Sequence, residues 1–233
     1  MFCGKCGTKI IDGDSFCTNC GAPISNLNLG QEEKNTENEN TISFGNATIG
    51  DTIKFGKFKY QIDQTEKQVP IEWIVLDIKD SKLLLLSKNG LCTDNYDENY
   101  SDRTGYEYVN WEECPLRKRL NNDFLNATFG INEQKKIVET EVINNGYSEY
   151  TNRDGKNTFD KIFLLSINEV KSYFKSEKER KCYKLLDNKN AIGWWLRTTF
   201  DGITNGVNEK GKFERDFVPY FSYYVRPAMW VKI

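Results

Sequence analysis

The sequence predicts an α+β fold in two parts, a small metal-binding module followed by one larger mixed domain. Four cysteines lie within the first twenty residues, which indicates the module. Segments rich in β-branched and aromatic residues open and close the rest of the chain, and segments with helical periodicity or capping boxes lie between them. The predicted boundaries are 1–24 for the module, 25–46 for a flexible linker and 47–233 for the α+β domain.

The cysteines of the module form two Cys-x-x-Cys pairs with ten residues between them, and each pair is followed by a glycine. Glycine permits the tight turn that points backbone N–H groups at the sulfur atoms. Four thiolates at this spacing favour tetrahedral Zn²⁺. A disulfide pair or an iron–sulfur centre is the alternative, but no signal peptide precedes the first cysteine and ferredoxins use other spacings. The predicted ligands of one structural zinc ion are Cys3, Cys6, Cys17 and Cys20.

The module depends on this metal, because it contains too few large apolar residues to build its own core. Zinc binding contributes about 10–16 kcal/mol to the folding of small zinc modules. The segment FCGKCGTKI…FCTNCGAPI resembles the short zinc ribbons found at the N-terminus of many bacterial proteins.

The chain contains no histidine, which excludes Ser-His-Asp and Cys-His nucleophile pairs and imidazole metal sites. We therefore expect a non-enzymatic protein.

No apolar run is long enough for a membrane span. The remaining cysteines are scattered singly, as expected for small buried side chains in a reducing compartment, so a cytoplasmic location is expected. They are Cys92, Cys114 and Cys182.

The linker carries four glutamates against one lysine and is rich in asparagine. Such a segment cannot bury enough surface to offset the entropy of ordering it, so we expect a flexible acidic tether. The domain that follows is nearly neutral and shows no basic patch of the kind that binds duplex nucleic acid.

The first half of the domain is expected to begin with strands. These strands are predicted at 52–55, 71–76 and 82–87, with a tight hairpin turn in 78–81. Pro115 then opens an amphipathic helix over 116–129, whose apolar face is formed by Leu116, Leu120, Phe124 and Leu125 and whose basic residues are expected to face water.

The second half begins with a short apolar strand predicted over 160–165. Two capping boxes, Ser166 with Glu169 and Ser176 with Glu179, predict helices. The first is expected to continue over 170–174 and the second over 183–186. A tryptophan-rich strand over 193–197 follows, and the last strand lies within 221–233. Turn signals between them stand at Asp201-Gly202, Asn205-Gly206 and Lys210-Gly211.

Several of these motifs occur in a recognisable order: IEWIVL, LLLLSKNGL, CPLRKRLNNDF, DKIFLLSINEV, WWLRT and VRPAMWV. From residue 51 to residue 232 the chain resembles a bacterial family of unknown function whose members often follow an N-terminal zinc ribbon. The resemblance implies no reaction. The C-terminal third is also similar to C-type-lectin-like domains and to the formylglycine-generating-enzyme fold, in which an arginine-bearing last strand packs against an aromatic core.

The C-terminal third contains a dense group of aromatic and charged residues that could form a ligand surface. Two interpretations stay open for it. The rings could stack on sugars, bases or other planar groups, with the arginines forming a positive spot that recognises an anionic or hydroxyl-rich ligand. Alternatively, the rings are the core and the arginines bond to carbonyl or carboxylate groups. The candidate ligand-binding residues are Trp194, Trp195, Arg197, Asp201, Tyr224 and Arg226.

An acidic segment, CTDNYDENYSDRTG, is a weaker candidate. Clustered oxygen ligands can bind Ca²⁺, but the spacing of Asp94, Asp97, Glu98 and Asp102 does not match a calcium hand. A solvated loop is the preferred interpretation.

The leading functional hypothesis is a zinc-binding recognition or adaptor protein whose lectin-like domain binds an unidentified partner protein or small polar ligand. One alternative is an oxidase of the formylglycine-generating type, which would hold copper through cysteines. The three cysteines of the domain lack the closely spaced pair that this resemblance requires. A second alternative is weak nucleic-acid binding by the ribbon through Lys5 and Lys9, although these two cations could neutralise few phosphates. Nucleic acid is therefore not an expected partner.

Overall fold

The computed structural model describes residues 43–62, 65–97, 109–144, 155–200, 203–216 and 223–233. Contacts divide the chain into two units, Met1–Asn40 and Thr41–Ile233, and every described residue belongs to the second unit. The predicted zinc ligands Cys3, Cys6, Cys17 and Cys20 therefore lie outside the described residues.

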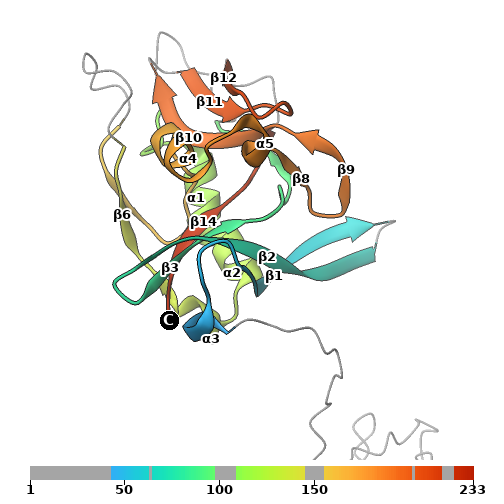
Figure 1. Cartoon of the computed structure of the whole chain (residues 1–233), viewed down its shortest axis with the longest axis vertical. Helices are drawn as coiled ribbons and strands as arrows, with labels where there is room; N and C mark the ends of the chain where they lie inside the picture. Colours follow the sequence, from blue (N-terminus) through green and yellow to red (C-terminus); the bar gives the residue numbers. More distant parts are fainter. Residues whose placement is uncertain (1–42, 63–64, 98–108, 145–154, 201–202, 217–222) are drawn as a thin grey trace, which may run out of the picture. The chain divides into compact units, whose positions relative to one another are not determined.

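Two five-stranded sheets carry most of the described strand structure (Figure 1). The first sheet has the order β1-β2-β3-β14-β5 and is antiparallel throughout. The second has the order β12-β11-β10-β13-β4, and its β10 and β13 are parallel. The strands of the first sheet are β1 (Thr52–Ile62), β2 (Thr65–Lys79), β3 (Lys82–Ser87), β5 (Ile137–Val138) and β14 (Ala228–Lys232). Those of the second are β4 (Thr93–Asp94), β10 (Trp194–Phe200), β11 (Ile203–Val207), β12 (Phe213–Asp216) and β13 (Tyr223–Tyr224).

Smaller elements connect the sheets. Two-stranded pairs are formed by β6 (Thr140–Val142) with β7 (Thr158–Asp160) and by β8 (Cys182–Lys184) with β9 (Asp187–Ile192). The helical elements are η1 (Phe44–Asn46), α1 (Pro115–Arg119), the π-helical turn η3 (Leu120–Phe124), α2 (Leu125–Thr128), α3 (Ile131–Gln134), α4 (Ile167–Tyr173) and α5 (Glu177–Arg180). Among the helices described here, none has the length and apolar character needed to cross a membrane.

The hairpin between β2 and β3 confirms the predicted tight turn. Lys79 pairs with Lys82, which leaves Asp80 and Ser81 as a two-residue loop. Both loop residues have positive φ, 49° and 55°. This is the conformation of a type I′ turn, whose twist matches that of the two strands it joins.

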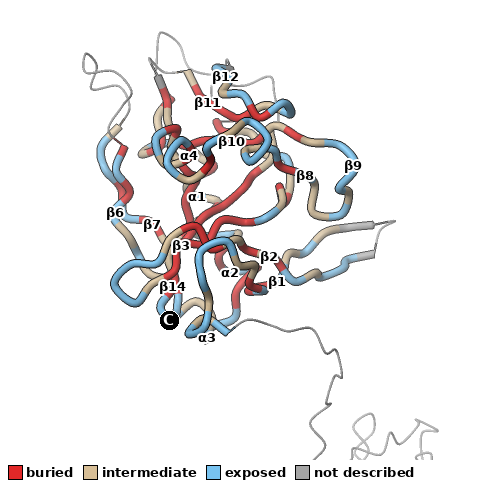
Figure 2. The backbone as a smooth tube through the Cα atoms, viewed as in Figure 1, coloured by how far each residue is buried: buried red, intermediate tan, exposed pale blue. Residues whose placement is uncertain are grey.

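The core is one cluster to which the first sheet, the helical stretch of α1, η3 and α2, the helix α4 and the second sheet all contribute. Leu116, Leu120 and Leu125 are buried, which confirms the predicted apolar face of this stretch. The residues of β3, β14 and β10 are mostly buried (Figure 2). The indole Nε1 of Trp73 donates to the Phe55 carbonyl at 2.7 Å, so this buried ring has its polar atom satisfied.

The expectation that the basic residues of this helical stretch face water is wrong for Arg117. Its Nε lies 2.7 Å from Oδ1 of Asp160, whose side chain is only 1% exposed. Asp160 also accepts hydrogen bonds from Nε1 of Trp111 at 2.9 Å and from the hydroxyl of Thr158 at 2.7 Å. A buried carboxylate requires such partners, and Arg117 supplies the opposite charge. These four residues are called the Asp160 network below.

The structure differs from three predictions for the second half of the domain. The predicted strand over 160–165 is interrupted after Asp160, where β7 ends, because Oδ1 of Asn121 accepts the N–H groups of residues 161 and 162. Beyond that point Phe163 forms only an isolated antiparallel bridge with Ala228. Asn205-Gly206 is not a turn but lies inside β11, where an added Cβ at Gly206 would come within 2.6 Å of the Tyr223 ring. The helix capped by Ser176 ends at Arg180. The turn signal at Lys210-Gly211 is confirmed, with φ of 84° at the glycine.

Candidate functional site

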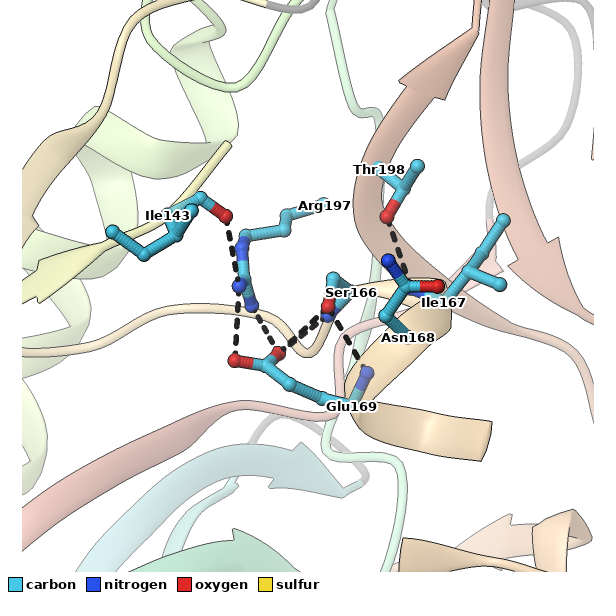
Figure 3. A pocket seen from close by; sticks show the side chains of 7 residues that line it. All are labelled: Ile143, Ser166, Ile167, Asn168, Glu169, Arg197 and Thr198. Atoms are coloured by element: carbon cyan, nitrogen blue, oxygen red, sulfur yellow. Dashed lines mark hydrogen bonds and ion pairs between the residues drawn. The ribbon is translucent and has the colours of Figure 1, made fainter. Parts of the chain in front are cut away.

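A pocket of about 240 Å³ lies where the end of β6, the start of α4 and the middle of β10 meet (Figure 3). Three segments of the chain that are distant in sequence supply its lining. The lining residues are Ile143, Ser166, Ile167, Asn168, Glu169, Arg197 and Thr198. Four of these seven belong to the capping segment of α4 and its first turn.

The local sequence explains how α4 begins here. The Ser166 hydroxyl accepts the N–H of Glu169 at 3.2 Å, and Oε2 of Glu169 accepts the N–H of Ser166 at 2.7 Å. This is the predicted capping box. The Thr198 hydroxyl accepts the N–H of Ile167 at 2.9 Å, which ties the helix start to β10.

Arg197 and Glu169 form an ion pair across the pocket. The Arg197 side chain is 3% exposed and that of Glu169 is 33% exposed. Nη2 of Arg197 donates to Oε1 of Glu169 at 2.9 Å, and Nη1 donates to Oε2. The same two nitrogens also donate to the carbonyl oxygens of Ile143, at 3.2 Å, and of Leu164, at 2.7 Å. Each Nη therefore has two acceptors, while the Nε of Arg197 has none among the described residues.

Sequence reasoning found half of this pair. Arg197 is a predicted site residue, with backbone carbonyls or an acid such as Asp201 or Asp216 as its expected partners. The carbonyl partners are confirmed, but the acid is Glu169. Glu169 was assigned only to its capping box, and the carboxylate performs both tasks. The available signal in the sequence was that the Ser166 capping box directly follows the apolar residues 162–165, whereas no such run precedes Ser176.

The tryptophans proposed for stacking on a ligand lie in the interior. Trp194 is 0% exposed and Trp195 is 1% exposed, and their Nε1 atoms donate to the carbonyl oxygens of Arg180 and Asp94. Neither ring presents a face to solvent, so burial supports the alternative in which they are core residues. Tyr224 is half-buried, with Nζ of Lys184 5.8 Å from its ring centroid, and Asp201 lies outside the described residues.

Arg226 is also interior, at 2% exposure. Its guanidinium lies 4.8 Å from the ring centroid of Trp194, and its Nε donates to the Ser87 carbonyl at 2.9 Å. No described carboxylate pairs with it, and burial lowers the pKa of the guanidinium from its ordinary value. The structure thus separates the two candidate arginines: Arg197 lines the pocket and Arg226 packs within the aromatic core.

The acidic segment is partly outside the described residues, because residues 98–108 are not described. Asp94 accepts two hydrogen bonds from Arg119, at 3.0 and 2.9 Å. Asp97 is buried rather than solvated. Within the described ranges, no group of three or more His, Cys, Asp or Glu side chains is placed to hold a metal ion.

The cysteines of the domain are free thiols with raised pKa values. Burial raises the pKa of Cys92 from 9.0 to about 11 and that of Cys114 from 9.0 to about 12, and it also raises the pKa of Cys182. The thiol form, which is a poor nucleophile and metal ligand, is therefore favoured at neutral pH. Folding keeps these groups protonated, so their contribution to stability is present below pH 9 and is lost as the pH rises toward 11–12.

This burial predicts slow alkylation. At pH 8 we expect iodoacetamide to modify Cys92 about 100-fold and Cys114 about 1000-fold more slowly in the folded chain than in urea, since each pKa unit changes the thiolate fraction about tenfold. Mass spectrometry of the digested chain measures each site separately. Modification of either thiol at its unfolded rate would contradict the prediction.

Comparison with known protein families gives two matches. A family model described as "zinc-ribbon domain" matches residues 2–24, the segment that contains all four predicted zinc ligands. Four thiolates in two Cys-x-x-Cys pairs fit a tetrahedral zinc ion, and they are the residues that would hold it. No curated protein and no solved structure matches the chain. A second model, described as "Domain of unknown function (DUF6273)", matches residues 80–233, so the chain belongs to this family and carries a zinc ribbon ahead of its family domain.

Proposed function

We propose that this chain is a non-enzymatic recognition protein that binds a small polar ligand in the pocket of Glu169 and Arg197. The zinc ribbon at 1–24 serves as a docking module with one structural ion, and residues 25–46 tether it to the domain at 47–233. Three free cysteines in the described residues support a reducing, cytoplasmic compartment.

The buried arginine of the pocket is the observation that carries the proposal. Removing a guanidinium from water is costly, and Arg197 is held by two carbonyl oxygens and one carboxylate. Glu169, its partner, remains one-third exposed toward the pocket. A small number of fixed polar groups beside apolar side chains, here Ile143 and Ile167, is the usual composition of a ligand site.

The scaffold of the domain is proposed to be lectin-like. This rests on the resemblance of the C-terminal third and on the position of Arg226, two residues before β14, with its guanidinium against Trp194. The expected arrangement is an arginine-bearing last strand packed on an aromatic core. The fold alone assigns no ligand.

Binding can be tested by filling the mouth of the pocket. Ile143 is 45% exposed and lines the pocket, so Ile143→Trp should reduce affinity more than about tenfold by occupying ligand volume. Ile78→Trp is the matched control, since Ile78 is 39% exposed and does not line the pocket.

The measurement is amide chemical-shift mapping of the zinc-loaded full chain against sugars, amino acids, nucleosides and organic acids. We expect at least one class to shift the amides of 166–169 and 197–198. If no compound in the panel moved those amides, or if Ile143→Trp bound as tightly as Ile78→Trp, the proposal would fail.

A further inference from the structure

The polar groups that line the pocket have unequal numbers of hydrogen bonds left to make. The backbone N–H groups of Ser166, Ile167 and Glu169 all have side-chain acceptors. Both Nη atoms of Arg197 donate twice within the protein. None of these backbone or guanidinium N–H groups is left to donate a hydrogen bond to a ligand.

Three other groups keep capacity. Oε1 of Glu169 accepts one hydrogen bond, from Arg197, and a carboxylate oxygen can accept two. The Thr198 hydroxyl accepts from Ile167, but its proton has no acceptor among the described residues. The Asn168 side chain is exposed and makes no hydrogen bond to a described residue. The pocket therefore offers an acceptor on Glu169, a donor on Thr198 and both kinds of group on Asn168.

The charge of the pocket opposes ionic ligands. An anion would find the Arg197 donors occupied and would stand against the exposed carboxylate of Glu169. A cation would be attracted by Glu169 but repelled by the guanidinium behind it, and it would leave the Thr198 proton without an acceptor. Since the pair sums to zero charge, neither sign gains from long-range attraction.

A neutral hydroxyl group meets both needs, because it donates and accepts at once. Glu169 and Thr198 line the same pocket as Ile143 and Ile167, so a ligand that carries several hydroxyl groups finds polar partners and apolar contacts within one cavity. The volume, about 240 Å³, corresponds to about eight water molecules at about 30 Å³ each, which limits the ligand to a single small ring or a short chain.

We infer that the ligand is a small neutral polyol, bound through its hydroxyl groups by Glu169, Thr198 and Asn168. This inference rests on the proposed function, since it names the ligand class of the same pocket. Thr198 and Asn168 are the residues that select a hydroxyl over an amine or an acid.

The test titrates the zinc-loaded full chain with three sets of probes: myo-inositol, glucose and glycerol; phosphate and acetate; guanidinium and putrescine. We expect only the first set to shift the amides of 166–169 and 197–198. Thr198→Val should weaken polyol binding about fivefold, the usual effect of losing one hydrogen bond, and Thr198→Ser should rescue it. Asn168→Ala should weaken it about threefold without affecting the fold, because that side chain is exposed.

Thr48→Val is the control, because Thr48 is exposed and does not line the pocket. Stronger shifts of the pocket amides by phosphate or guanidinium than by the polyols would overturn the ligand class and leave the proposed function standing. Polyol binding that is unchanged in both Thr198→Val and Asn168→Ala would overturn the assignment of these residues. If neither these probes nor the wider panel shifted the pocket amides, the proposed function itself would fail.

Discussion

Removing zinc from the full chain is expected to unfold residues 1–24 while the domain at 47–233 keeps its thermal transition. The ribbon has few large apolar residues, so metal binding of about 10–16 kcal/mol is the main source of its stability. The domain does not depend on the metal, because its core is built from its own strands and helices. Elemental analysis gives zinc per chain, and amide dispersion reports the state of the ribbon.

Tryptophan fluorescence reports the domain alone, since all five tryptophans of the chain lie in it. Cys17→Ser should abolish stoichiometric zinc, whereas Cys92→Ser should retain one ion per chain, because Cys92 lies outside the ribbon. Zinc retained by Cys17→Ser, or absent from wild-type protein prepared without chelators, would contradict the predicted ligand set.

Replacing Asp160 with alanine is expected to destabilise the domain by about 3–5 kcal/mol, the usual cost of removing one partner from a buried ion pair. The substitution leaves Arg117 without its carboxylate, and the Nε1 of Trp111 and the hydroxyl of Thr158 lose their acceptor. Asp160→Asn should cost less, because an amide oxygen can still accept hydrogen bonds. Urea unfolding followed by tryptophan fluorescence measures each difference.

Glu66→Ala provides a matched comparison for this experiment. Glu66 pairs with Lys59 at 3.0 Å, but their side chains are 56% and 45% exposed. Such surface pairs contribute about 1 kcal/mol or less. If Asp160→Ala cost no more than Glu66→Ala, the Asp160 network would not have the structural role assigned to it.

Local sequence signals predicted the parts of this chain whose causes are local. The zinc-ribbon pattern, the cap at Ser166 and the turn at 80–81 each depend on a few consecutive residues, and the family match or the described structure agrees with them. The strand that carries Trp194 and Trp195 was also predicted. Periodicity could not show that both faces of this strand are covered.

Features that depend on distant partners were not predictable in this way. Glu169 and Arg197 are 28 residues apart, and a capping box already accounted for the glutamate. Arg117 was placed in water because Asp160, 43 residues later, had no visible link to it. The candidate site was therefore identified only in part: one of its two charged residues was named, and the pocket emerged once β6, α4 and β10 were seen together.

The position of β14 has a consequence for the order of events during synthesis. Residues 228–232 pair with β3 on one side and with β5 on the other, so they fill the middle of a sheet whose neighbours were translated long before. A nascent chain that has not yet reached this segment exposes the apolar edges of β3 and β5. Completion of this sheet therefore depends on pairing between strands that are far apart in the sequence, and such long-range pairing is expected to slow folding.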